Sequence, residues 1–240
     1  MRAKISFLQF IISILIGIYA FIMIIYIEAN YISPKQLFFM TMWNCFISTI
    51  YLITISICDF SFFYIKSNKL EKLNEFFRET LSPAFTALTY LVTFTFWVMI
   101  FPVLVKSGNG NFGLNLYTNL YVHLILTIFQ TVDIFFSYRK NKGIIMKYDF
   151  LIAAFIMGSY AILTLILVYG YNYAVYPFLK HMTWYKGLGE LILFEVMMFL
   201  FYLIHVGFIK LKYKYKIYIL MDGTNESDIL ENIKENEYVN

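Results

Sequence analysis

Charge, glycine, proline and cysteine are all scarce in this sequence. Only 14% of its 240 residues are charged, and it contains 11 Gly, 4 Pro and 2 Cys. The low glycine and proline content excludes a fibrous or loop-rich protein. Cys45 and Cys58 fall in one expected helix, about 20 Å apart at about 1.5 Å per residue, which excludes a disulfide between them.

Several familiar motifs are also absent. The chain has no Gly-x-Ser-x-Gly, His-Glu-x-x-His, phosphate-binding loop or dinucleotide fingerprint, and no spacing of residues that would hold a metal. We therefore expect no cofactor and no metal ion. The net charge of +4 comes from lysines between apolar runs rather than from a basic groove with stacked aromatics. Nucleic acid is not an expected partner.

Apolar residues make up the rest of the chain. At 60% hydrophobic and 21% aromatic, it carries more apolar surface than a soluble core of this size could bury, so lipid must surround it. Six runs are long enough to cross a bilayer, which takes roughly 20 residues each. The expected spans are residues 5–27, 37–58, 83–105, 115–137, 149–170 and 187–209. The sequence predicts an all-α, polytopic membrane bundle of six transmembrane helices that forms one domain over residues 1–217.

Basic residues predict the orientation, because cytoplasmic loops are enriched in Lys and Arg. Fifteen of the 19 lie on the side that holds both termini, and the other four are Lys35, Lys106, Lys180 and Lys186. Both termini are therefore expected in the cytoplasm. We expect the plasma membrane or an endomembrane such as the endoplasmic reticulum as the location.

Two segments outside the expected spans have their own composition. Residues 68–81 place apolar side chains at helical spacing after capping-box residues, which predicts a helix along the inner membrane surface. Residues 218–240 are acidic and polar, which predicts a disordered cytoplasmic tail. The tail carries the only glycosylation sequon, Asn225-Glu226-Ser227, and a cytoplasmic tail would leave it unmodified.

Span four carries the most informative polar residues. At about 100° per residue, Asn119, His123, Thr127 and Gln130 fall within roughly 80° of one another, so this stripe cannot face lipid. Taken alone, the stripe favours hydrogen bonding between helices. The alternative is that His123 is a general base, because an imidazole can take up and return a proton near neutral pH.

A general base needs a nucleophile, and span two offers Thr41. The helical rise puts Thr41 and His123 roughly 6 and 12 Å below the outer ends of their helices, so the two can meet in the outer leaflet. Asn44 and Ser48 share the face of Thr41 and could orient the base or hold an oxyanion. A threonine in such a helix otherwise bonds its own backbone, and the other two could equally link helices.

Acidic residues and a further histidine define the remaining alternatives. Asp133 lies about 15 Å along the helix from His123, too far to orient that imidazole, and is expected at the inner interface. Glu190, Glu195 and His205 lie in span six, where a carboxylate costs at least a few kcal/mol unless it is paired or protonated. Glu195 is the feature that would support a transporter or proton-coupled carrier. A non-catalytic membrane scaffold is the third class.

Span three has its own polar stripe, which we interpret as a packed helix interface rather than a cavity lining. Its members are Thr86, Thr89, Tyr90, Thr93 and Trp97.

The order of these features resembles the androgen-induced membrane protein family, which includes the androgen-dependent regulator of tissue factor pathway inhibitor. The resemblance covers about residues 35–210. The matching pieces are Phe39-Met40-Thr41, Cys58-Asp59, Phe96-Trp97, Asn119-x-x-x-His123 with Asp133 ten residues later, and Val175-Tyr176-Pro177-Phe178-Leu179.

The resemblance implies a multi-pass hydrolase in which Thr41 and His123 cleave fatty acid esters of hydroxy fatty acids. The expected partners are a lipid ester from the bilayer and the membrane lipids. His181, in the loop before span six, could attract the substrate carboxylate, or could simply be solvated. The chain departs from its relatives in having no proline midway through span three, where Pro83 stands at the start, and no second histidine beside Leu120.

Overall fold

A computed structural model describes residues 7–31, 39–65, 68–102, 116–137, 139, 147–173 and 183–215. In these ranges all regular secondary structure is helical, and six helices are long and apolar enough to cross a membrane. They comprise Leu8–Asn30, Met40–Ser61, Lys72–Val98, Tyr117–Phe136, Tyr148–Gly170 and Trp184–Lys214. The prediction of an all-α bundle with six spans is confirmed. His181 and residues 218–240 lie outside the described residues.

Helices α1 and α2 are single uninterrupted elements, Phe7–Tyr31 and Met40–Ile65, and α9 is Trp184–Lys214. The other three spans contain π-helical turns, in which a carbonyl accepts from the amide five residues later rather than four. Span three joins α3 (Asn68–Glu75), η2 (Phe76–Leu81), α4 (Ser82–Phe94) and η3 (Thr95–Ile100). Span four joins α6 (Leu116–Leu120), η4 (Tyr121–Ile125) and α7 (Leu126–Phe136), and span five joins α8 (Lys147–Leu165) and η5 (Ile166–Gly170).

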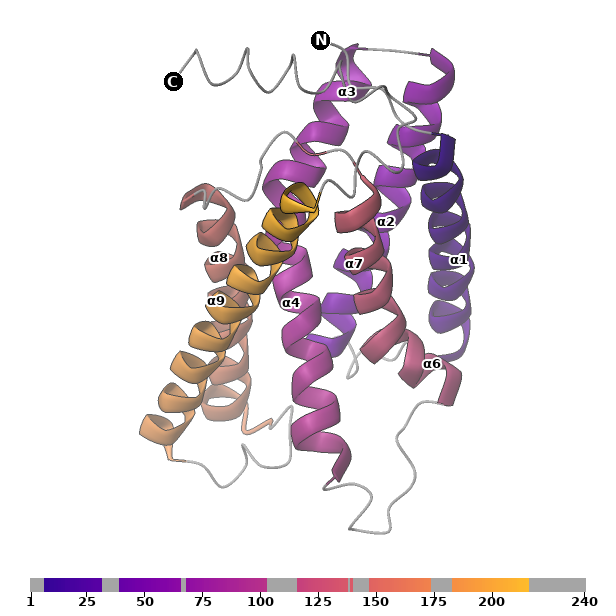
Figure 1. Ribbon diagram of the computed structural model, residues 1–240. Coiled ribbons are helices and arrows are strands. Elements are labelled where there is room, and N and C mark those ends of the chain that lie inside the picture. Colours follow the sequence, from indigo (N-terminus) through magenta and orange to yellow (C-terminus); the bar gives the residue numbers. More distant parts are fainter. Residues whose placement is uncertain are drawn as a thin grey trace.

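The expected surface helix at residues 68–81 is part of span three instead. Figure 1 shows α3 running without a break through η2 into α4. The prediction is wrong because Asn74 and Arg78, two polar residues of this segment, are buried inside the bundle. Its polar positions therefore do not mark a separate helix on the membrane surface. The third span therefore extends further toward the end of the bundle where α1 begins.

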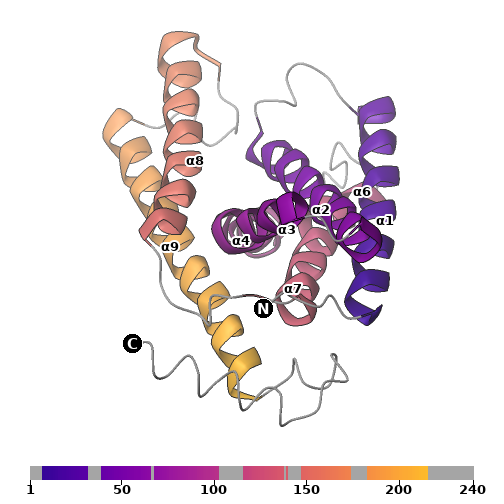
Figure 2. The ribbon, with the colours of Figure 1, turned by 90° about the horizontal axis from the view of Figure 1, so that it is seen from above.

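The bundle is built around α4. Viewed from above, α1, α2 and α7 lie on one side of α4, and α8 and α9 pair on the other (Figure 2). Each side has its own buried apolar cluster: one draws on α1, α2, η4 and α7, and the other on α4, α8 and α9. The first residues of α1 and the last residues of α9 lie at the same end, as an even number of spans requires (Figure 1).

Helices α1 and α2 pack with almost no space between their backbones. A Cβ on Gly17 would lie 2.4 Å from Oγ and 2.5 Å from Cβ of Ser56, so only glycine fits there. The Ser56 hydroxyl donates to the carbonyl of Ser13 at 2.5 Å. Small residues that allow close backbone approach are typical of helix pairs in lipid, where no hydrophobic force drives helices together.

Candidate active site

Thr41 is the second residue of α2, at the end of the bundle opposite the start of α1, and its side chain is partly exposed. This end of α2 is fixed to α8, because the Met40 amide donates to the Tyr160 hydroxyl at 3.1 Å and the Trp43 ring meets Tyr160 edge-on at 5.6 Å. The candidate nucleophile therefore lies on an anchored helix start rather than in a free loop.

His123 lies at the centre of the π-helical turn η4, and its side chain is 4% exposed. The amide of Leu126 donates to the carbonyl of Tyr121, five residues back. The imidazole lies flat against the Phe96 ring, with the centroids 3.6 Å apart and the planes inclined by 7°. Trp97 Nε1 donates to the backbone carbonyl of His123 at 3.1 Å. π-Helical turns occur frequently at functional sites, and this one holds the candidate base.

Asn44 and Ser48 come together in the core, where both are fully buried. The Ser48 hydroxyl donates to Asn44 Oδ1 at 3.1 Å, and the Thr89 hydroxyl donates to the same oxygen at 2.8 Å. The two hydroxyls are also 2.9 Å apart. Asn44 Nδ2 is buried and has no hydrogen-bond acceptor in the part of the chain that the structure describes. These contacts link α2 to α4, so Ser48 and Thr89 join the helices and hold the amide of Asn44.

The predicted stripe on span four faces the protein, as expected. Asn119, His123 and Gln130 are buried, and Thr127 is half-buried with its hydroxyl 2.6 Å from that of Thr93. Both polar atoms of the Gln130 amide lack a partner in the described structure.

The polar stripe on span three is a packed interface, as interpreted from the sequence. Besides the contacts of Thr89, Thr93 and Trp97, the Tyr90 hydroxyl lies 2.7 Å from that of Thr131 on α7. These bonds run from α4 and η3 to α2, η4 and α7, so the stripe joins the central helix to its neighbours.

The candidate pair comes from elements that pack together. Met42, next to Thr41, and Val122, next to His123, belong to one buried apolar cluster. Both candidate residues are described, and no hydrogen bond joins them. Nδ1 of His123 is buried and finds no partner among the described residues. The catalytic roles of Thr41 and His123 therefore stay a prediction, as does the role of His181.

Glu190, Glu195 and His205 all lie on α9. Glu195 is half-buried on α9, and a Cβ on Gly158 of α8 would be 3.7 Å from its Oε1. Glu190 is also half-buried, with one carboxylate oxygen that finds no described partner. His205 is fully buried, and neither ring nitrogen has a partner in the described parts of the chain.

A second polar centre, which the sequence did not predict, lies toward the opposite end of the bundle. Arg78 on η2 donates to both oxygens of Asp59 at 2.6 and 2.7 Å, and to Asp133 Oδ1 at 3.0 and 3.2 Å. Arg139 donates to Asp133 Oδ2 at 2.9 Å, and Tyr51 donates to the same oxygen at 2.9 Å. All four charged residues are buried. We call Asp59, Arg78, Asp133 and Arg139 the ion network.

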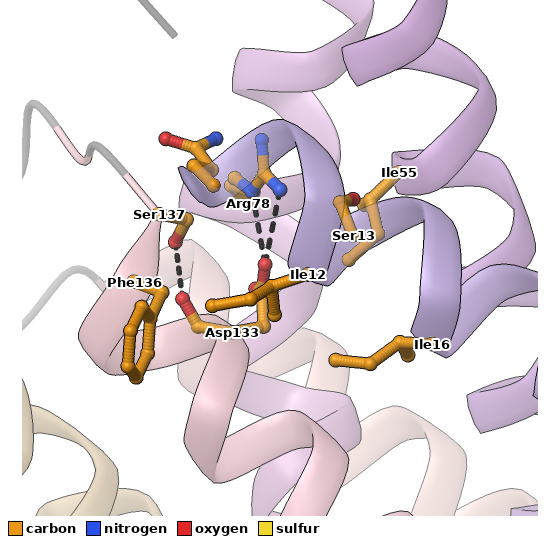
Figure 3. A pocket seen from close by; sticks show the side chains of 9 residues that line it. Ile12, Ser13, Ile16, Ile55, Arg78, Asp133, Phe136 and Ser137 are labelled. Carbon is orange, nitrogen blue, oxygen red and sulfur yellow. Dashed lines mark hydrogen bonds and ion pairs between the residues drawn. The ribbon is translucent and has the colours of Figure 1, made fainter. Parts of the chain in front are cut away.

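The ion network joins α2, span three and α7 and carries no net charge, since two guanidinium groups balance two carboxylates. A hollow beside it is walled by apolar side chains such as Ile12 and Ile16 from α1, with the Arg78 and Asp133 pair at its edge (Figure 3). Asp133 is thus not a triad acid but a structural partner of two arginines. The sequence held a signal for this centre, because Asp59 and Asp133 each needed a buried partner and Arg78 was an arginine on the neighbouring span three.

The described residues contain no cluster of three or more His, Cys, Asp or Glu that could hold a metal ion. In comparisons with known proteins, a family model described as FAR-17a/AIG1-like protein matches residues 6–210. No curated protein and no solved structure matches the chain.

Proposed function

Because the chain belongs to the FAR-17a/AIG1-like family, which is the androgen-induced gene 1 family, we propose that it is an intramembrane hydrolase of lipid esters. In this proposal Thr41 is the nucleophile, His123 is the general base, and the substrates are fatty acid esters of hydroxy fatty acids. The observation that carries the proposal is the placement of His123: a buried imidazole in a π-helical turn, held by two aromatic residues of the neighbouring span.

Helix register supports the pairing of the two residues. Ser48 on α2 contacts Thr89 on α4, and the two helices run in opposite directions. Thr41 lies seven residues before Ser48 on α2, and Phe96 lies seven residues after Thr89 on span three. Because the two helices run in opposite directions, both residues lie toward the same end of the bundle, each about 10 Å beyond that contact at about 1.5 Å per residue. Phe96 stacks on His123. Nucleophile and base therefore belong to the same half of the bundle, as the depths estimated from sequence require.

The proposed reaction has two steps. His123 takes the hydroxyl proton of Thr41 as its oxygen attacks the ester carbonyl, and the resulting imidazolium returns that proton to the hydroxy fatty acid that leaves. The acyl group then remains on Thr41 as an ester. In the second step His123 takes a proton from water, whose oxygen attacks this ester, and the fatty acid leaves as Thr41 regains its proton. The low dielectric of a lipid-lined site strengthens any donor aimed at the oxyanion.

The test uses purified full-length protein in detergent and a fatty acid ester of a hydroxy fatty acid as substrate. Wild type should release the hydroxy acid, Thr41→Ala and His123→Ala should not, and Thr41→Ser should keep activity because it keeps a hydroxyl. Thr54→Ala is the matched control, since the Thr54 hydroxyl donates to the carbonyl of Ile50 in its own helix, at 2.8 Å.

A covalent probe of the serine-hydrolase type gives a second readout. It should label wild type at Thr41 and should not label Thr41→Ala. If wild type shows neither turnover nor labelling, the hydrolase proposal is wrong, and a carrier that uses Glu195 or a membrane scaffold becomes the reading to test. If turnover survives Thr41→Ala while His123→Ala is inactive, another nucleophile must be sought beside the base.

A further inference from the structure

A general base in a hydrolase is usually oriented by a third group, most often a carboxylate that accepts from its second ring nitrogen. His123 has no such group in the described structure. Its Nδ1 is buried without a partner, and Asp133, the acidic residue on the same span, is committed to Arg78, Arg139 and Tyr51. The imidazole must be held in another way if it is to work as a base.

The contacts that do hold His123 come from two consecutive residues of η3. Phe96 fixes the plane of the ring by lying flat against it, and Trp97 fixes the backbone by donating its indole N–H to the His123 carbonyl. One turn further into the bundle, the hydroxyl bond between Thr93 and Thr127 clamps the same two spans. Ring, backbone and helix are thus all fixed by span three.

The stacking geometry also distinguishes between the two charge states of the imidazole. Two neutral aromatic rings prefer offset or edge-on contacts with centroids about 4.5–7 Å apart. A cation, by contrast, is attracted to the face of an aromatic ring. At 3.6 Å and with nearly parallel planes, Phe96 presents its ring face to the imidazole, where it can attract the imidazolium that His123 forms once it has accepted the Thr41 proton.

We propose that Phe96 and Trp97 are the positioning residues of the general base and take the place of the acid of a triad. This inference rests on the proposed hydrolase function for its catalytic meaning. Phe96 orients the imidazole and stabilises its protonated form through the ring face. Trp97 keeps the π-helical turn that carries His123 in register with span three. Both residues act through His123, and neither is proposed to contact the substrate.

Kinetics test the catalytic part. Trp97→Phe keeps an aromatic ring and removes only the N–H donor, and Phe96→Leu keeps apolar volume and removes the ring face. Each should lower kcat by roughly 10- to 100-fold with little change in KM, the size of effect expected when a catalytic group is misplaced by about 1 Å. Phe96→Tyr retains the ring face and should keep most of the activity.

Phe94→Leu is the matched control, because Phe94 lies on the same span but contacts Phe201 of α9, at 5.8 Å. It should leave kcat unchanged. If Phe96→Leu and Phe94→Leu lower kcat equally, or if the loss is in KM alone, the positioning role is wrong.

Carbon-13 NMR of the histidine rings tests the geometry without relying on activity. The chain has only three histidines, His123, His181 and His205, so a sample labelled at Cε1 gives three signals that His181→Gln and His205→Gln assign. The proton bonded to Cε1 of His123 should be shifted upfield by the ring current of Phe96. Phe96→Leu should abolish that shift, and Phe94→Leu should not.

The two experiments separate the possible failures. If wild type lacks hydrolase activity but shows the upfield signal, the proposed function fails and the stacked geometry stands without its catalytic meaning. If wild type hydrolyses the ester but no histidine signal depends on Phe96, the hydrolase stands and the positioning role is overturned. If Phe96→Leu does not purify as a folded protein, Phe96→Met replaces it in both experiments, because it also keeps apolar volume and removes the ring face.

Discussion

Arg78 donates from both terminal nitrogens to the two carboxylate oxygens of Asp59, at 2.6 and 2.7 Å, in the buried interior of a membrane bundle. Such a bidentate pair is among the strongest charged hydrogen bonds in proteins. Here the same guanidinium also donates to Asp133 and to the Asn74 amide oxygen, the latter at 2.9 Å. One side chain therefore connects α2, α3 and α7.

Arg78→Leu should lower the free energy of unfolding by about 3–5 kcal/mol, because it leaves Asp59 and part of Asp133 buried without a compensating charge. Arg78→Lys should also destabilise the protein, since an ammonium cannot reproduce the planar fork. Denaturant titration in detergent micelles measures the change. Lys72→Leu is the control. Lys72 also lies on span three but is exposed, so its removal should have little effect on the free energy of unfolding. If Arg78→Leu and Arg78→Lys were as stable as Lys72→Leu, the ion network would not hold the bundle together.

Gly17→Ala should destabilise the contact between α1 and α2 by about 1–3 kcal/mol, the usual cost of overpacking. Ser56→Ala should not rescue it, because Cβ of Ser56 would still lie 2.5 Å from the new methyl group, whereas Ser56→Gly should. Gly207→Ala is the matched control. A Cβ there meets nothing within 4 Å, so alanine should stabilise α9 by up to about 1 kcal/mol through its helix propensity. Thermal unfolding followed by tryptophan fluorescence would compare these variants with wild type.

Asn44→Leu separates a catalytic role of Asn44 from a structural one. The hydroxyls of Ser48 and Thr89 remain 2.9 Å apart after the change, and Thr89 still donates to the Phe85 carbonyl at 2.9 Å, so no hydroxyl loses all its partners. Folding should survive. If the unpaired amide nitrogen donates to the oxyanion, kcat should fall by roughly 100- to 1,000-fold. Unchanged turnover would assign Asn44 to helix packing alone.

Asn225 should remain without glycan when the chain is made in a secretory cell, because the predicted orientation keeps residues 218–240 in the cytoplasm. Enzymatic deglycosylation followed by a gel-shift assay measures this, and a sequon engineered between residues 103 and 115 is the positive control. A glycan on Asn225 would show that the orientation is the opposite of the predicted one, with the Thr41 end of the bundle on the cytoplasmic side.

The spans and the burial of the span-four stripe could be predicted from sequence because both depend on local pattern. A run of apolar residues must be long enough to cross the bilayer, and polar residues on one helix face must avoid lipid. The expectation for Cys45 and Cys58 rested on helical rise in the same way, and both are free and buried.

The ion network and the π-helical turns could not be predicted in this way. Arg78 and Asp133 are 55 residues apart, and their contact depends on which helices are neighbours, which hydropathy does not reveal. A turn with one extra residue, as at His123, leaves no mark in the composition of its segment. The same blind spot explains the error at residues 68–81, where the amphipathic pattern of a buried, charged helix end is also that of a surface helix.

The short separation of Asp59 and Arg78, 19 positions, bears on how the protein is made. The two residues belong to consecutive spans, so the pair can close as soon as span three leaves the ribosome, before Asp133 and Arg139 have emerged from it. An isolated charge at membrane depth is costly, and mutual neutralisation removes most of that cost. Spans two and three can thus enter the bilayer as a preassembled hairpin, onto which the later helices dock.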